Sequence, residues 1–274
     1  MFQLIRCLPV CLLIFLCACN DSNEESGQEE EATDSTQGII EAVPPSTEAT
    51  DLCWWGLLNK KTSVLLHYSI YDKTIVGTIT YLNTKLKTPI KILGAVESDN
   101  SYRLLEFEED GNITGIITGK PAGKIFNGSW FSPKSRKEFP LELNKKDSII
   151  ESTKLPLASD DIFGSYHYQY SQDGQHGQFE LNKLNDEKIA FSIFSVTSAP
   201  ERNMADIPLD TIPFTGNSFI YKIPGSDSCE LKVTIYNNFL KVDYTKGHCT
   251  DQFGWNATVE GIFLKEKKKS VVNK

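Results

Sequence analysis

The distribution of apolar residues from Leu52 onward is the feature that most limits what this chain can fold into. Apolar and polar residues alternate in short runs, and no long stretch has the periodicity of a helix. Turn residues such as Asp110-Gly111-Asn112 separate consecutive runs. The sequence therefore predicts an all-β protein of antiparallel strands. A meander of this kind hides its edge strands by closing into an up-and-down barrel.

The runs fall into two blocks, which we interpret as two β-barrel-like domains. The first covers residues 52–144, the second covers residues 160–268, and the polar segment 145–159 is expected to link them. Residues 269–274 form a tail. The expected strands are Ser63–Ile70, Thr74–Leu82, Pro89–Val96, Ser101–Phe107, Ile113–Gly119, Lys124–Phe131 and Glu138–Leu143, then Phe163–Tyr170, Gln178–Leu184, Lys188–Val196, Ser218–Ile223, Cys229–Tyr236, Phe239–Tyr244 and Thr258–Lys265. Ser198–Phe214, which contains three prolines, is predicted to be irregular.

The stretch CELKVTIYNNFLKVDYTK predicts a hairpin that turns at Asn237-Asn238. The expected cross-strand pairs are Ile235 with Leu240, Val233 with Val242, Leu231 with Tyr244, and Lys232 with Asp243. This register leaves Cys229 opposite Lys246, and a turn at Gly247 brings Cys249 within bonding range. We therefore predict a structural disulfide between Cys229 and Cys249 rather than two buried thiols, with Cys53 left unpaired.

The N-terminal segment has the three-part layout of a secretory signal. Arg6 supplies a positive charge, an apolar run follows from Leu8 to Cys17, and Ala18 is small. The run is too short to span a bilayer, so residues 1–18 are expected to be cleaved. An ordinary signal peptide, cut near residue 19 without lipid attachment, is one interpretation.

The residues Leu-Cys-Ala-Cys that end at Cys19 support a second interpretation, because they resemble a bacterial lipobox. The resemblance implies that Cys19 becomes the first residue of the mature protein and carries fatty acyl chains such as palmitate. One chain holds a protein to a membrane only reversibly, whereas several anchor it durably. The membrane, reached through Cys19, is therefore an expected partner.

Residues 19–51 are predicted to be a disordered acidic tether. Residues 20–51 hold ten acids and no base, and they offer too few apolar side chains to form a core. The acids resemble the export signal of Bacteroidota lipoproteins, which implies the outer membrane and its outer surface; a solvated spacer is the alternative. The segment Leu52–Lys274, with 26 acids and 27 bases, has no evident basic surface for nucleic acid.

Motifs that would indicate catalysis are not found in the sequence. The four histidines lie in different runs without the spacing of a zinc site, and His176 is expected at a loop tip. There is no phosphate loop, calcium loop or nucleophile elbow. The acids from Glu106 to Asp110 are interpreted as a solvated strand end. We therefore expect no metal, no cofactor and no enzyme, and a carboxylate-dependent hydrolase remains only as an alternative.

Tryptophans provide the candidate ligand site. Trp54 and Trp55 open the first block and Trp130 lies in NGSWF, where core packing is the commoner role. Because an eight-stranded barrel can hold one small ligand, these three residues are predicted to line its mouth. The predicted function is a binding module for a small ligand, a glycan or a protein. An inhibitor of a lysozyme-like or other hydrolase, with Ser198–Phe214 as the plug, is the alternative.

Two parts of the chain resemble known families. The C-terminal stretch resembles the end of a domain of bacterial lipoproteins to which no activity is assigned, and the residues that carry the likeness are Cys229, Cys249, Phe253, Gly254, Gly261, Phe263 and Lys265. The first block, with VGTITY, LLEFEEDGNITGIITG and NGSWFSP, resembles calycin-type domains such as lipocalins and avidins. These likenesses imply calycin-like barrels. The Gly-x-Trp opening of lipocalins is absent, so a ligand cavity does not follow.

Overall fold

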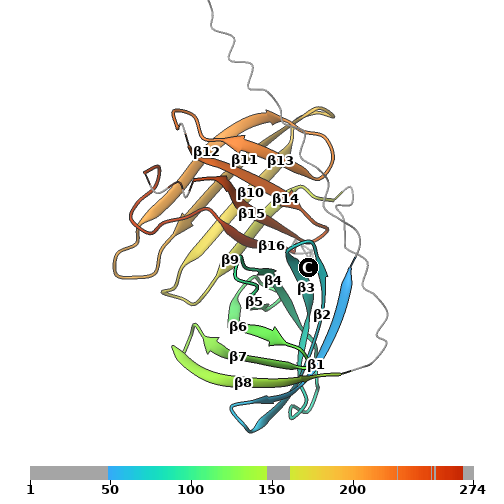
Figure 1. Cartoon of the computed structure of the whole chain (residues 1–274). Helices are drawn as coiled ribbons and strands as arrows, with labels where there is room; N and C mark the ends of the chain where they lie inside the picture. The colour runs from blue at the N-terminus through green and yellow to red at the C-terminus, as the bar shows by residue number, and fades with distance from the viewer. Residues whose placement is uncertain (1–48, 147–160, 227, 248, 250, 268–274) are drawn as a thin grey trace, which may run out of the picture. The chain divides into compact units, whose positions relative to one another are not determined.

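A computed structural model describes residues 49–146, 161–226, 228–247, 249 and 251–267. Every regular element in these ranges is a β-strand, as predicted, and the strands form two antiparallel eight-stranded sheets (Figure 1). All of these residues belong to one compact unit. The predicted signal, the lipidation site Cys19, most of the tether, residues 147–159 of the expected linker and the tail lie outside the described residues.

The first sheet is a closed barrel in which each strand pairs with the next one in the chain and β1 pairs with both β2 and β8. The strands, coloured blue to green in Figure 1, are β1 (Thr50–Leu58), β2 (Thr62–Tyr71), β3 (Thr74–Tyr81), β4 (Ile90–Val96), β5 (Tyr102–Phe107), β6 (Ile113–Ala122), β7 (Ile125–Ser132) and β8 (Lys137–Lys145). The predicted strands are confirmed to within a few residues at their ends. β1 was not predicted, and it includes the last two residues of the expected tether, Thr50 and Asp51.

Aromatic side chains occupy the barrel interior. Trp54 Nε1 donates a hydrogen bond to the hydroxyl of Tyr68 at 2.9 Å, and its ring lies 5.9 Å from that of Phe126. Tyr102 meets the rings of both Tyr68 and Phe126. An eight-stranded barrel is only wide enough for its interior to be filled by side chains or to hold one small ligand, and large rings from four different strands fill this one.

The second sheet has the order β12-β11-β10-β9-β16-β15-β14-β13. Its strands are β9 (Gly164–Gln169), β10 (His176–Lys183), β11 (Lys188–Val196), β12 (Met204–Pro213), β13 (Ser218–Lys222), β14 (Glu230–Ile235), β15 (Phe239–Lys246) and β16 (Gly261–Lys265). The two edge strands, β12 and β13, are joined by residues 214–217, which span about 17 Å at most. The sheet must therefore curl into a half-barrel, and the hydroxyl of Tyr221 on β13 donates to Asp210 on β12 at 2.7 Å.

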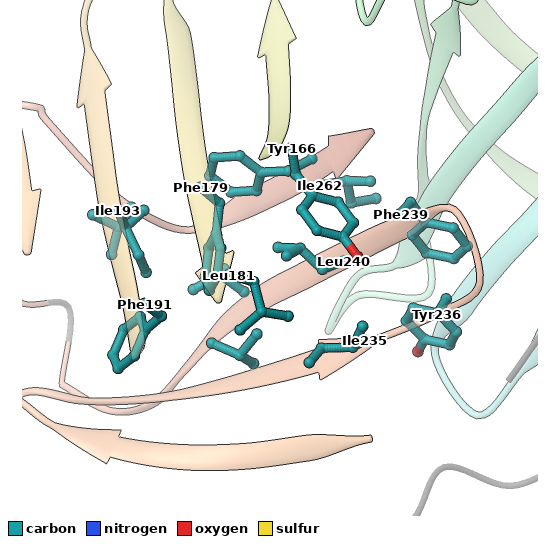
Figure 2. Close-up of a cluster of buried hydrophobic side chains, with 14 of the residues drawn as sticks. Tyr166, Phe179, Leu181, Phe191, Ile193, Ile235, Tyr236, Phe239, Leu240 and Ile262 are labelled. Atoms are coloured by element: carbon teal, nitrogen blue, oxygen red, sulfur yellow. The ribbon is translucent and has the colours of Figure 1, made fainter. Parts of the chain in front are cut away.

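The core of the half-barrel is a cluster of buried apolar side chains from both halves of the sheet (Figure 2). Phe191 on β11 lies 5.0 Å from the rings of both Phe219 and Tyr221 on β13. Phe179 on β10 contacts Phe263 on β16. These contacts connect strands that do not share backbone hydrogen bonds, so packing across the concave face holds the curled sheet together.

The predicted β14–β15 hairpin is confirmed in its four cross-strand pairs. Tyr236 N donates to Phe239 O at 2.9 Å across the Asn237-Asn238 turn. One detail was wrong: Glu230 rather than Cys229 lies opposite Lys246, because a bulge falls between Glu230 and Leu231. The predicted disulfide is present, with the Cα atoms of Cys229 and Cys249 4.9 Å apart, and Cys53 is a buried free thiol.

The prediction that Ser198–Phe214 is irregular was wrong, because Met204–Pro213 forms strand β12. β12 is an edge strand, where a proline needs no ladder hydrogen bond on its solvent side. Asp210 pairs with Phe191 and Ile207 pairs with Ile193, so two residues of β12, Pro208 and Leu209, lie opposite one residue of β11. They form a bulge. The segment expected to plug a hydrolase is therefore mostly strand. His176, expected at a loop tip, is the first residue of β10.

The outer face of the barrel shares a core with the second sheet. Along β4, Ile92 belongs to the barrel interior, whereas the next residue, Leu93, belongs to the cluster of the half-barrel. Leu104 and Leu105 on β5 divide in the same way. This alternation means that each strand contributes one face to each core. The two sheets are thus packed together through apolar side chains.

The turn between β5 and β6 makes close polar contacts with β9. His167 Nε2 hydrogen-bonds the carbonyl oxygen of Asp110, and Gln169 N donates to the carbonyl oxygen of Gly111 at 3.2 Å. Gly111 has a φ of +81°, and a Cβ atom there would lie 2.3 Å from His167 Nε2. Glycine is therefore required at this contact both by its backbone conformation and by the available space.

Candidate functional site

The three tryptophans predicted to line a ligand mouth do not share a site. Trp54 is 1% exposed inside the barrel, whereas its neighbour Trp55 is 48% exposed on the outer face. Successive side chains of a strand point to opposite faces, so these two cannot meet. Trp130 also points inward, but it lies far from Trp54 along the barrel. The β8 residue opposite Trp130 is Phe139, whereas the β8 residue opposite Trp54 is Lys145. Those β8 positions are about 20 Å apart along the strand.

Trp130 instead belongs to a polar cluster inside the barrel around Glu106. The interpretation of Glu106 as part of a solvated strand end was wrong, since it is 3% exposed. Its carboxylate accepts hydrogen bonds from Tyr81 Oη at 2.8 Å, Trp130 Nε1 at 2.9 Å and Thr114 Oγ1 at 3.1 Å. Burial and the adjacent carboxylate raise the pKa of Tyr81, so it stays a neutral donor. Three donors account for the buried carboxylate without a ligand.

A cavity of about 300 Å³ lies between the barrel and the half-barrel. We call it the groove. One wall comes from the end of β4 and from β5, and the other from β15 and the residues leading into β16. The charged and aromatic residues that line it are Glu97, Arg103, Tyr170, Lys241, Asp243 and Glu260. This volume is at the lower end of the range for small-ligand pockets.

The charges in the groove are only partly compensated. Lys241 Nζ lies 2.7 Å from Asp243 Oδ1, and the Lys241 side chain is only 13% exposed. Arg103 Nη2 donates a long hydrogen bond of 3.4 Å to the Tyr170 hydroxyl. Glu260 lines the same wall as the ion pair of Lys241 and Asp243. With three carboxylates and two cations, the groove has a small excess of negative charge.

The pKa of Glu260 is raised from its ordinary value. Partial removal from water is the main cause, the carboxylates of Asp243 and Glu97 add to it, and Lys241 opposes it. A cation beside these carboxylates would relieve their mutual repulsion. The groove therefore suits a ligand with a positive group at Glu260.

Sequence reasoning missed the residues of the groove. Glu97 and Arg103 come from the first block, and Lys241, Asp243 and Glu260 come from the second. No motif connects them, because their proximity depends on how the two sheets pack. In the described ranges, no group of three or more His, Cys, Asp or Glu residues is placed to hold a metal ion. Those ranges also contain no helix long and apolar enough to cross a membrane.

Comparison of the chain with protein-family models, with curated proteins and with solved structures gave no match. The resemblances to lipoproteins and to calycins therefore stay predictions, and the functional argument rests on the geometry of the groove.

Proposed function

We propose that this protein is a lipid-anchored binding protein of the bacterial cell envelope, exposed at the outer membrane, and that its ligand is a small molecule with a cationic amine. The observation that carries the proposal is the groove, a cavity of about 300 Å³ in which carboxylates outnumber cations. The groove replaces the barrel mouth of the sequence prediction as the ligand site. Large side chains fill the barrel interior, which supports this choice.

The composition of the groove supports an amine rather than an anion. Asp243 is already paired with Lys241, which leaves Glu97 and Glu260 to face the ligand together with Arg103. An ammonium group between the two acids would be charge-compensated, and Arg103 would orient a polar group at the other end of the ligand. Amino sugars and amino acids have this chemistry and fit the volume.

Binding of such an amine is expected to strengthen as the pH rises through the raised pKa of Glu260, because the ligand stays protonated while the carboxyl ionises. Glu260→Gln should weaken binding about fivefold at pH 6.5 and flatten the pH dependence. Since folding raises this pKa, the contribution of Glu260 to the free energy of unfolding falls over the same rise in pH. Isothermal titration calorimetry with glucosamine, lysine and arginine between pH 4 and pH 6.5 measures the affinity, and unfolding in urea at the same pH values measures the stability.

Glu187→Gln is the matched control, because Glu187 lies exposed in the turn between β10 and β11, away from the groove. It should leave affinity and pH dependence unchanged. No binding of any of the three amines, or equal binding by the Glu260→Gln variant, would contradict the proposal.

The anchor at Cys19 has its own test. Cys19→Ser is expected to abolish incorporation of labelled palmitate and to release the protein from the membrane fraction of the expressing cells. The proposal predicts that the variant still folds and binds the amine, because the groove is built from residues 94–262. A variant that keeps its label and its membrane association would show that the cysteine is not acylated.

Carboxylate-dependent hydrolysis is a second candidate, since Glu260, with a raised pKa, shares the groove with Asp243. A pair of carboxyl groups in one cleft is what a glycoside hydrolase needs. Turnover of chromogenic glycosides that is lost in Glu260→Gln would support it, whereas the binding proposal expects no turnover.

A further inference from the structure

Within the described ranges, Arg103 is the cation of the groove that lacks an acidic partner. Lys241, the other cation of the lining, lies 2.7 Å from Asp243, whereas Arg103 takes part in none of the ion pairs of these ranges. Arg103 is exposed, and its Nη2 donates one long hydrogen bond of 3.4 Å to the hydroxyl of Tyr170. A guanidinium has five N–H donors in a planar fork, so most of them can face a ligand.

Two carboxylates of the groove, those of Glu97 and Glu260, also lack an ion pair in the part of the chain that the structure describes. Ala95 pairs with Arg103, and Glu97 N donates to the carbonyl oxygen of Ser101 at 2.8 Å. Glu97 and Arg103 are therefore diagonal neighbours on one wall. Glu260 belongs to the facing wall, and the Glu97 carboxylate contributes to its raised pKa, so the two acids face the same space.

We propose that the ligand of the groove is an amino acid, with its carboxylate bound by Arg103 and an ammonium group between Glu97 and Glu260. This assignment rests on the proposed function, since it requires an amine in the groove. Arginine binds a carboxylate through two parallel hydrogen bonds, and charge-assisted bonds of this kind are about twice as strong as neutral ones. A ligand with only an amine would compensate the acids and leave the guanidinium without an anionic partner.

The spacing of the charges favours an amino acid over an amino sugar. Diagonal neighbours on paired strands are about 7–8 Å apart, so Glu97 and Arg103 can bind the ammonium and the carboxylate of one small molecule at the same time. The hydroxyls of a sugar are neutral acceptors, which bind a guanidinium more weakly than a carboxylate does.

Net charge alone predicts the opposite preference. Three carboxylates and two cations line the groove. Cadaverine, which is lysine without its carboxylate, carries two positive charges, whereas lysine has a net charge of one, so attraction by the excess negative charge would favour cadaverine. Tighter binding of lysine would therefore show that the carboxylate itself is recognised.

Isothermal titration calorimetry at pH 6.5 compares lysine with cadaverine and arginine with agmatine, its decarboxylated form. We expect each amino acid to bind about tenfold more tightly than the amine that lacks the carboxylate. Arg103→Gln should weaken lysine binding about tenfold and should not weaken cadaverine binding. Arg103→Lys keeps the charge but lacks the planar fork, so it should recover only part of the lysine affinity.

Arg136→Gln is the matched control, because Arg136 is exposed in the turn between β7 and β8 and does not line the groove. It should leave all four affinities unchanged. Cadaverine that binds as tightly as lysine, or an Arg103→Gln variant that loses both ligands equally, would overturn the amino-acid assignment and leave the amine proposal in place. No binding of any of the four ligands would instead overturn the amine proposal, and the assignment would fall with it.

Discussion

Trp54→Ala is expected to lower the free energy of unfolding by about 3–5 kcal/mol, whereas Trp55→Ala should lower it by less than about 1 kcal/mol. The two residues are neighbours on β1, but Trp54 is 1% exposed and Trp55 is 48% exposed. Removal of the Trp54 ring leaves a cavity in the barrel interior and breaks the hydrogen bond to Tyr68. Urea unfolding of the two variants, followed by circular dichroism, measures the difference.

Trp54→Phe separates the two contributions to this effect. The phenyl ring keeps most of the packing against Phe126 but cannot donate to the Tyr68 hydroxyl. We expect a loss of about 1–3 kcal/mol, between those of the other two variants. Similar losses for Trp54→Ala and Trp55→Ala would contradict the assignment of Trp54 to the core and would favour the mouth position expected from the sequence.

The strands could be predicted from the sequence wherever one face of a strand is apolar and the other polar. The β14–β15 hairpin is the best example, because the two-residue turn at Asn237-Asn238 sets the register and every pair from Ile235 to Leu231 then agrees with it. β1 could not be found in this way. Cys53 and Trp54 are both buried although they point to opposite faces, so TDLCWWGLL does not alternate.

The candidate site was harder to predict than the fold. Glu106 had a usable signal, since Leu104 and Glu106 are two positions apart on one strand and must share a face. The inward direction of Leu104 then places the Glu106 carboxylate inside the barrel. The groove had no such signal. Arg103 and Glu260 are brought together by the packing of two sheets, which short-range patterns of hydrophobicity do not specify.

Removal of the disulfide through Cys229→Ala and Cys249→Ala is expected to lower the free energy of unfolding by about 3 kcal/mol. The bond closes a loop of 20 residues that contains the β14–β15 hairpin, and its loss gives that loop more freedom in the unfolded chain. Both cysteines are buried, so alanine adds no polar group to the core. Urea unfolding of the oxidised protein and of the double variant measures the change.

The same protein with and without reductant provides the control. Reduction should lower the stability of the wild type about as much as the double substitution does, and it should leave the double variant unchanged, because Cys53 is the remaining cysteine of the described residues. The groove should keep most of its affinity, since β15, which carries Lys241 and Asp243, is also held by β14 and β16. Loss of amine binding on reduction would mean instead that the disulfide positions the wall formed by Glu260, and a double variant as stable as the oxidised wild type would refute the structural role of the bond.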